Sequence, residues 1–233
     1  MASSPKFTLY TNRGCPWCRR VHAALNELGT EVEEVTIDLS KPRPDWYLKI
    51  NPKGQVPTLV YDDKVVSESD VITRFFADRE PSHLVKIPGE EGAEAQRAQY
   101  DAFVNQFLEL AQKPVMGTIF AGIEMTSERA DEVLDKIATT LEPQLASAKP
   151  FFGGSDKLTL VEVLTGPFLS MLFDLAIPEF KFPANWNSLV ESKTPVFYKW
   201  AKATANHDSI SFTWNKEVAT NAIRGIAAAR ATK

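Results

Sequence analysis

The only two cysteines of the chain stand at the ends of a Cys-Pro-Trp-Cys motif at positions 15 to 18. An apolar run over residues 7 to 10 precedes the motif, and a helical pattern over residues 16 to 28 follows its first cysteine. A C-x-x-C that closes a strand and opens a helix places its first sulfur beside unpaired N–H groups and the positive end of the helix dipole, which favour thiolate over thiol. Cys15 is therefore predicted to be a nucleophile, and redox or thiol-transfer chemistry is the leading hypothesis.

A purely structural role for the cysteine pair is less favoured. With no further cysteine in the chain, the pair is neither a remnant of a disulfide framework nor half of a four-thiolate zinc site. The histidines His22, His83 and His207 show no metal-ligand spacing, so we predict no metal.

Length and charge exclude several functional classes. The chain has 233 residues, 44% of them hydrophobic, which allows two domains of about a hundred residues each. Its formal charge is −4 and its basic residues form no cluster longer than Arg19-Arg20, so neither nucleic acid nor a membrane surface is an expected partner. A solvated helix face is the favoured interpretation of these two arginines. No apolar stretch approaches the roughly 20 residues of a membrane span and the start does not resemble a secretory signal, so we predict a cytoplasmic protein.

The first eighty residues alternate between strand and helix signals. Strands are predicted over residues 7–10, 32–37, 57–61 and 64–66, and helices over residues 16–28, 46–50 and 69–77. The order β-α-β-α-β-β-α is typical of a thioredoxin-like domain, which we assign to residues 1–80. Tyr10 stands at the end of the first apolar strand, so core packing is its favoured role.

The remainder of the chain has a different pattern. Residues 81–92 contain prolines and glycines that interrupt any periodicity, and they are predicted to be a linker. Residues 93–233 are predicted to form an all-helical domain, because apolar residues recur at three and four spacing over residues 93–123, 127–148, 159–175, 195–206 and 214–229. Thr159 and Glu162 fit a capping box at one helix start. The predicted fold class is therefore α/β plus all-α, a thioredoxin-like domain followed by a helical one.

Two signals downstream of the cysteines indicate a binding site. The proline of Val56-Pro57 enters a strand beside the C-x-x-C helix, where a cis peptide would turn the backbone of Val56 toward an incoming thiol ligand. Glu68 and Ser69 stand at a turn into a helix, where N–H groups and the Ser69 hydroxyl suit a carboxylate while Glu68 suits an ammonium. Together these signals predict a site for a zwitterion.

This chain resembles the cytosolic glutathione transferases, and among them the cysteine-type omega class. The likeness rests on the C-x-x-C motif, on residues 44–46, 51–59 and 68–69, and more loosely on residues 151–154 and 158–162. It implies that Cys15 forms a mixed disulfide with glutathione and that Val56 pairs its backbone with the cysteinyl unit across a cis Pro57. It also implies that Glu68 and Ser69 hold the γ-glutamyl end. Arg43 stands where omega members often have a lysine that binds the glycyl carboxylate.

The resemblance also guides the remaining predictions. Many omega members have a small residue where this chain has Cys18, so the second thiol leaves a glutaredoxin-like dithiol cycle open. The family implies a homodimer and a cleft between the domains with an apolar wall for the co-substrate. Phe107, Phe120 and Trp214 are candidates for that wall, although core packing is the alternative for each of these aromatic residues.

Three functions remain open from the sequence. The first is a glutathione-dependent thiol transferase or reductase, acting in deglutathionylation or in reduction of dehydroascorbate or disulfides. The second is a glutathione S-conjugating or conjugate-cleaving transferase in detoxification or biosynthesis, and the third is a non-catalytic ligand-binding protein. The expected partners are glutathione, as co-substrate, and a small apolar or disulfide-containing molecule.

Overall fold

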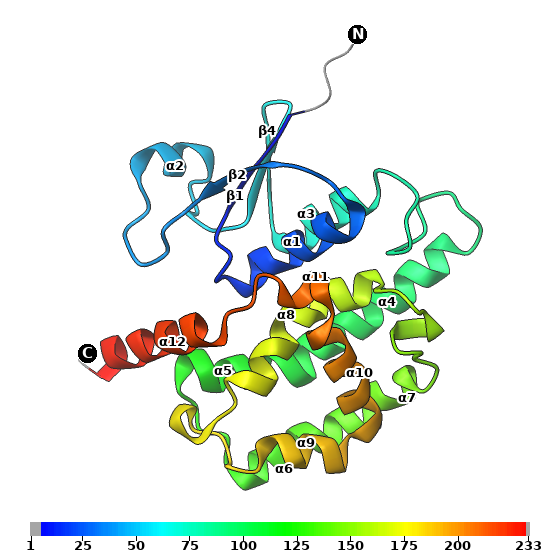
Figure 1. The fold of residues 1–233 in the computed structure, drawn as a ribbon, viewed down its shortest axis with the longest axis vertical. Helices are drawn as coiled ribbons and strands as arrows, with labels where there is room; N and C mark the ends of the chain where they lie inside the picture. The colour runs from blue at the N-terminus through cyan, green and yellow to red at the C-terminus, as the bar shows by residue number, and fades with distance from the viewer. Residues whose placement is uncertain (1–5, 232–233) are drawn as a thin grey trace.

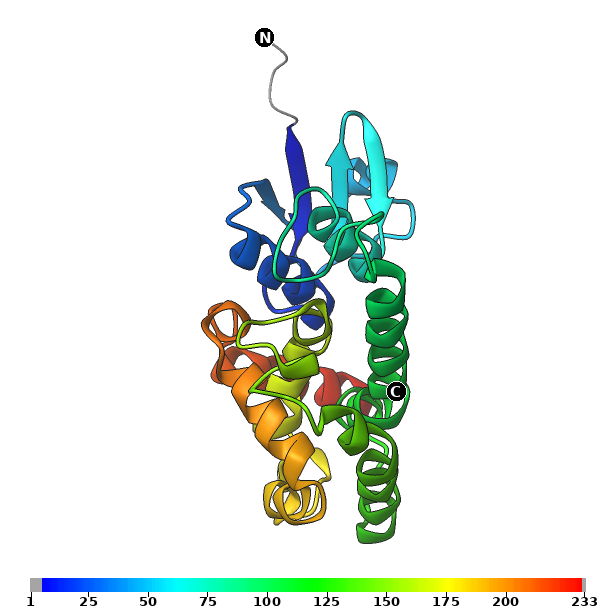
Figure 2. The ribbon, with the colours of Figure 1, turned by 90° about the vertical axis from the view of Figure 1, so that its right-hand side faces the viewer.

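The N-terminal domain of the computed structural model stacks on one end of a larger helical domain (Figures 1 and 2). The structure describes residues 6–231. Its first domain contains β1 (Phe7–Thr11), α1 (Pro16–Leu28), β2 (Glu33–Thr36), α2 (Asp45–Ile50), β3 (Thr58–Tyr61), β4 (Lys64–Ser67) and α3 (Ser69–Ala77). This order is the predicted one, and the thioredoxin-like assignment is confirmed.

The sheet is mixed, with the strand order β2-β1-β3-β4. β1 and β2 are parallel because α1 connects them as a crossover, whereas β3 pairs antiparallel with both β1 and β4. The β3–β4 hairpin turns at Asp62 and Asp63, whose φ angles of 46° and 60° suit a tight two-residue turn. The pairing of β1 with β3 ends at Tyr10 and Thr58, so the chain before Thr58 lies beyond the ladder.

Helices cover the sheet on both faces. α1 and α3 pack on the face that looks toward the helical domain, as Figure 1 shows. The small core on that face comes from both strands and helices and consists of Phe7, Leu9, Val21, Leu25, Leu59, Ile72 and Phe76. On the opposite face, the ring of Tyr10 lies 5.5 Å from that of Tyr47 in α2. Neighbouring residues of a strand point to opposite faces, so Tyr10 is a packing residue of the α2 side, in agreement with its predicted role.

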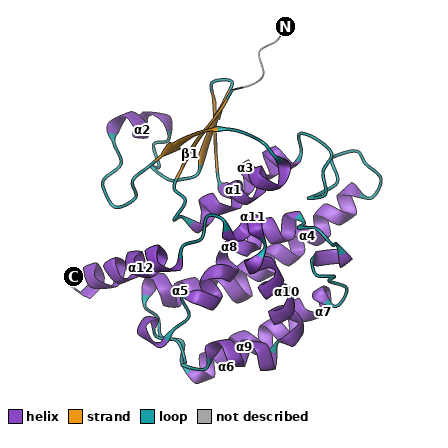
Figure 3. Cartoon of the chain, viewed as in Figure 1, coloured by secondary structure: helices purple, strands orange, loops and turns teal. Residues whose placement is uncertain are grey.

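The helical domain accounts for most of the chain (Figure 3). Its helices are α4 (Ala93–Phe107), α5 (Lys113–Ala121), α6 (Ser127–Lys136), α7 (Glu142–Leu145), α8 (Leu160–Asp174), α9 (Trp186–Lys193), α10 (Pro195–Asn206), α11 (Asp208–Ser211) and α12 (Lys216–Ala231). The predicted patterns over 93–123 and 127–148 are continuous helical rods, each with one π-helical turn, η1 (Leu108–Gln112) and η2 (Ile137–Leu141). Among the described residues, no helix is both long and apolar enough to cross a membrane.

Helix α8 is the centre of the helical domain. Every residue from Leu160 to Phe173 is buried, because α8 packs against α1, α4 and α10. The predicted capping box at its start is confirmed, with the Thr159 hydroxyl accepting from the Val161 N–H and the Glu162 carboxylate accepting from the Thr159 N–H at 2.8 Å. Glu162 also accepts from the Thr159 hydroxyl, the Phe152 N–H and the Trp200 indole N–H, so four donors converge on one buried carboxylate.

The two adjacent arginines of α1 are buried between the domains, which corrects their predicted exposure. Arg19 is 2% exposed and Arg20 is 3% exposed, because the face of α1 that carries them packs against α8 and does not face solvent. Arg19 donates to the carbonyl oxygens of Pro167 and Ile210, and Arg20 donates to that of Leu164 at 2.7 Å. The two guanidinium groups therefore form hydrogen bonds that stabilise the contact between the thioredoxin-like domain and the helical domain.

Candidate active site

Cys15 lies at the junction of β1 and α1. It is the residue that caps α1, in an extended conformation with φ of −83° and ψ of 121°, and Pro16 occupies the first helical position without losing a needed donor. Its own N–H donates to the Asn12 carbonyl at 2.9 Å, which closes the turn after the strand. The sulfur is consequently held at the open end of the helix, as the sequence predicted.

The surroundings of Cys15 favour its thiolate. Its pKa is lowered from the ordinary 9.0 to about 7, chiefly by a hydrogen bond from the Cys18 thiol. The backbone N–H groups of Cys18 and Trp17 and the charge of Arg19 act in the same direction, whereas burial opposes them. The lowered pKa therefore raises the share of Cys15 that is ionised and nucleophilic near neutral pH.

Cys18 has a different environment one helical turn further on. Its side chain is fully buried, and burial raises its pKa well above the ordinary value. Its sulfur accepts a hydrogen bond from the Asn12 N–H at 3.4 Å. At neutral pH Cys18 is thus a protonated thiol that donates to Cys15.

A cleft of about 540 Å³ opens beside the Cys15 sulfur. Its lining includes six residues that the sequence predicted, namely Cys15, Arg43, Val56, Pro57, Glu68 and Ser69. Seven further lining residues were not predicted to contact a ligand, namely Trp17, Arg20, Leu39, Gly54, Gln55, Ser67 and Asp70. The predicted set therefore meets in space, although its members are spread over more than fifty residues of sequence. No group of three or more potential metal ligands occurs within residues 6–231.

The loop before β3 presents the backbone of Val56 to this cleft. The Val56-Pro57 peptide is cis, and Val56 lies past the last β1–β3 pair. Asn51 holds the loop by donating its side-chain amide to the Gln55 carbonyl at 3.1 Å and to the Thr58 hydroxyl at 2.8 Å. An extended ligand in the cleft can therefore pair with the backbone of Val56, whose position is held by the hydrogen bonds of Asn51 to the residues on either side.

Glu68 and Ser69 form another wall of the cleft. Glu68 has a φ of 74°, a conformation that is unfavourable for a residue with a side chain and that concentrates at functional sites. It directly precedes α3, so Ser69 is the first helical residue and its neighbouring N–H groups lie at a helix start. The Ser69 hydroxyl accepts from Arg20 at 3.4 Å, which gives this corner of the cleft a buried positive charge.

Arg43 lines the cleft but is engaged with the backbone. Its guanidinium donates to the carbonyl oxygens of Gly54 at 3.0 Å, Asp38 at 3.0 Å and Lys41 at 2.7 Å. Gly54 is required at this contact, because a Cβ there would lie 3.0 Å from the Arg43 side chain and would need the positive φ of 62°. Arg43 therefore ties two loops together, and carboxylate binding by Arg43 stays a prediction.

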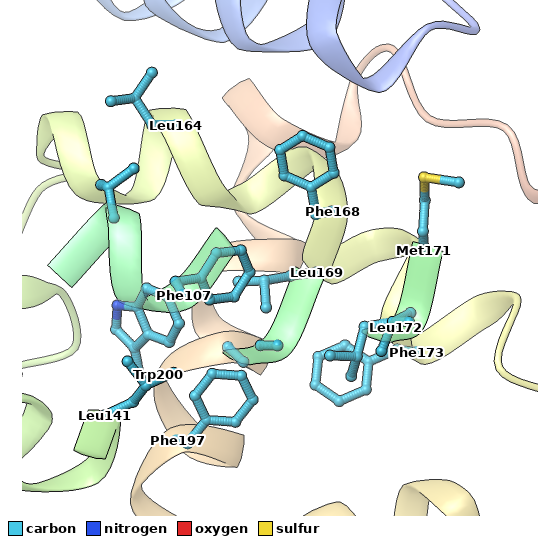
Figure 4. Close-up of a cluster of buried hydrophobic side chains, with 14 of the residues drawn as sticks. Phe107, Leu141, Leu164, Phe168, Leu169, Met171, Leu172, Phe173, Phe197 and Trp200 are labelled. Atoms are coloured by element: carbon cyan, nitrogen blue, oxygen red, sulfur yellow. The ribbon is translucent and has the colours of Figure 1, made fainter. Parts of the chain in front are cut away.

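The three predicted aromatic residues of the helical domain are not among the residues that line this cleft. Phe107 is fully buried and packs with Phe197 and Trp200 in the core of the helical domain, which corrects the prediction that its ring contacts a co-substrate (Figure 4). Phe120 is partly buried against the same core, and Trp214 donates its indole N–H to Asp174 at 2.7 Å. Contacts of Phe120 and Trp214 with a co-substrate stay predictions.

Trp17 is the aromatic residue that does lie beside Cys15. It lines the cleft and is 39% exposed, although its ring packs against that of Phe168 in α8 with the two ring centroids 4.7 Å apart. The sequence signal that could have identified Trp17 as a cleft residue was its position between the two cysteines, two residues after Cys15.

Comparisons with known proteins agree with this geometry. The family model of the glutathione S-transferase N-terminal domain matches residues 14–79. Glutathione S-transferase U19 of Arabidopsis thaliana is 30% identical over 82% of this chain and 82% of its own. Glutathione S-transferase DHAR3, chloroplastic, from the same plant is 26% identical over 74% of this chain, and only 59% of its own length is covered. Omega-class transferases of Caenorhabditis elegans and Rattus norvegicus also match.

Solved structures share the fold over nearly the whole chain. Glutathione transferase Omega 1C from Trametes versicolor superposes with a TM-score of 0.78, covering 95% of this chain and 96% of its own at 24% identity. Together with the thiol, the cis proline and the Glu-Ser corner described above, these similarities show that the chain belongs to the glutathione transferase family.

Proposed function

We propose that this protein is a glutathione-dependent thiol transferase that forms a mixed disulfide between Cys15 and glutathione. The observation that carries the proposal is the thiolate character of Cys15 at the mouth of the cleft, where its pKa is lowered to about 7. A cysteine thiolate can bond covalently to the glutathione sulfur, whereas a serine or tyrosine in that place could only hydrogen-bond to it. Thiol exchange is therefore favoured over conjugation.

The walls of the cleft suit the parts of glutathione. The carboxylate of Glu68 would pair with the γ-glutamyl ammonium, and the Ser69 hydroxyl and the N-terminal N–H groups of α3 would receive the γ-glutamyl carboxylate. The exposed backbone of Val56 would pair with the cysteinyl amide, which directs the glutathione sulfur toward Cys15. Arg43 would face the glycyl end from the loop after β2.

The chemistry proceeds by two exchanges. The Cys15 thiolate attacks the glutathione sulfur of a glutathionylated substrate, and the substrate thiol leaves as the new S–S bond forms. A second glutathione thiolate then attacks the glutathione sulfur of the mixed disulfide, which frees Cys15 and releases oxidised glutathione. Removal of glutathione from conjugated thiols and reduction of small disulfides are the activities that we assign to this cycle. Reduction of dehydroascorbate would enter it by another first step, in which the Cys15 thiolate adds to a carbonyl carbon and a glutathione thiolate then attacks the Cys15 sulfur, which releases ascorbate and leaves the same mixed disulfide. Homodimerisation and a cytosolic location stay predictions from the resemblance.

Intact-mass analysis after exposure to oxidised glutathione tests the proposal. The wild type and Cys18→Ser should each gain one glutathione at Cys15, removable by a reductant, because Cys15 alone is ionised near neutral pH. Cys15→Ser should gain none, since the remaining Cys18 is buried and protonated. A Cys18→Ser variant that takes up no glutathione covalently would support a ligand-binding protein instead, because it has no second thiol that could displace glutathione from Cys15.

A further inference from the structure

Arg20 is a buried cation at the corner of the cleft that Glu68 and Ser69 form. Its side chain is 3% exposed, yet it lines the cleft. Burial lowers its pKa to about 10, so the guanidinium keeps its positive charge at pH 7. A charge in such a place is costly unless hydrogen bonds and an opposite charge replace its lost hydration. The partners of this guanidinium therefore decide what the corner can bind.

The guanidinium of Arg20 is held in place by the helical domain and by a neighbouring ring. Its Nε donates to the Leu164 carbonyl of α8 at 2.7 Å. Its Cζ lies 4.7 Å from the ring centroid of Trp17 and 4.8 Å from that of Phe168, which lies on the side of α8 that faces the N-terminal domain (Figure 4). These contacts restrain the guanidinium, so the N–H groups that remain keep their position beside Ser69.

The partners of Arg20 are incomplete, in contrast to those of its neighbour Arg19. Within residues 6–231, Nη2 of Arg20 has no hydrogen-bond partner. The carboxylate of Asp70 acts on Arg20 from α3, but both its oxygens already accept from Nε of Arg74 at 3.0 Å. The guanidinium of Arg19 donates to two carbonyl oxygens and two hydroxyl groups. The charge of Arg20 is thus the one that an anion in the cleft would complete.

The hydrogen bond from Arg20 also determines what the Ser69 hydroxyl can do. Nη1 of Arg20 donates to this hydroxyl at 3.4 Å. A hydroxyl that accepts from a guanidinium still has its own proton to donate. Ser69 is the first residue of α3, where the backbone N–H groups have no acceptor within the helix. The hydroxyl proton and these N–H groups are therefore available to one acceptor in the cleft, next to a buried positive charge.

We propose that Arg20 is a positioning residue for the γ-glutamyl carboxylate of glutathione. Its charge attracts the carboxylate to the start of α3, and its hydrogen bond to Ser69 leaves the hydroxyl proton free for a carboxylate oxygen. This inference rests on the proposed function, because it requires glutathione to lie with its γ-glutamyl end at Glu68 and Ser69. Arg20 acts through Ser69 and not on the reacting sulfur atoms, so its effect is on binding and not on thiol exchange.

With Arg20 included, the corner offers one charge for each charge of an amino-acid end. The carboxylate of Glu68 would receive the ammonium, and the guanidinium of Arg20 would face the carboxylate. Lys53 is the cation near Glu68, with Nζ 3.9 Å from Oε1, but both side chains are exposed and water screens their interaction. The buried charge of Arg20 is screened much less. The corner should therefore select ligands that carry a free carboxylate beside the ammonium.

The test compares the affinities of two ligands for the full-length protein by titration calorimetry. One ligand is S-methylglutathione, and the other is the same molecule with its γ-glutamyl carboxylate converted to a primary amide, which keeps the shape and the ammonium but not the negative charge. The wild type should bind the amide about a hundredfold more weakly, and Arg20→Met should reduce this ratio about tenfold by weakening only the binding of S-methylglutathione. Equal affinities in the wild type would overturn the role of Arg20, whether or not the variant folds.

Arg19→Met is the matched control for a purely structural effect. Arg19 is buried at the same contact between the domains but does not line the cleft, so this variant should keep the wild-type ratio of affinities. A ratio that falls equally in both variants would overturn the proposal, because a loosened domain contact would then be the cause. An unchanged ratio in Arg20→Met would overturn it as well. A wild type that does not bind S-methylglutathione at all would instead overturn the proposed function.

Discussion

Replacing Cys15 with serine should reduce glutathione-dependent disulfide reduction by at least about a thousand-fold, because the substitution removes the atom that forms the mixed disulfide. A serine hydroxyl is not ionised near pH 7, whereas the Cys15 pKa is lowered to about 7. Cys18 cannot replace it, since that thiol is fully buried and its pKa is raised. The measurement is the rate of glutathione release from a mixed disulfide of glutathione with a small thiol.

The same variant distinguishes the rival activity. Binding of S-methylglutathione, measured by calorimetry, should persist in Cys15→Ser because Val56, Glu68 and Ser69 are unchanged. Retained reductase activity would contradict the assignment of Cys15. A conjugating activity toward an electrophile that survives or increases in the variant would support the alternative, in which the site only stabilises the glutathione thiolate.

Replacing Glu162 with alanine should produce the largest loss of stability. The carboxylate accepts from Thr159 N–H and hydroxyl, the Phe152 N–H and the Trp200 indole, and all four donors would be left buried without an acceptor. We expect a loss of about 3 to 5 kcal/mol in the free energy of unfolding. For a chain of this size that lowers the midpoint of thermal unfolding by about 6 to 20 °C.

A matched control is available on the surface. Glu191 is an exposed glutamate of helix α9, and Glu191→Ala should shift the unfolding midpoint by no more than about 1 °C. Circular dichroism followed during heating measures both variants. An unfolding midpoint of Glu162→Ala equal to that of Glu191→Ala would contradict the structural role of the buried carboxylate.

The parts of the site that the sequence predicted depend on local signals. A cysteine before a helix-starting proline, a proline at a strand entry and a Glu-Ser pair at a helix start each fix the backbone within a few residues. Their order along the chain then follows the thioredoxin-like topology, which brings Cys15, Val56 and Ser69 to one cleft. The capping box of Thr159 and Glu162 was predictable for the same reason.

The parts that were missed depend on how the domains dock. Nothing in the sequence near Arg19 and Arg20 indicates that backbone carbonyl oxygens of α8 accept hydrogen bonds from the two guanidinium groups. The spacing of Phe107 from the other apolar residues of its helix is compatible with a place in the core or in the cleft. The packing of α4 against α10 places Phe107 in the core.

The most direct test of the account is a titration of Cys15 itself. The rate of iodoacetamide alkylation at Cys15, followed by peptide mass mapping over a range of pH, should rise with a midpoint of about 7. In Cys18→Ala the midpoint should move upward, because the hydrogen bond from Cys18 is the main cause of the lowered pKa. A wild-type midpoint near the ordinary value of 9.0, unaffected by Cys18→Ala, would contradict the central claim that this thiol is held ionised for exchange with glutathione.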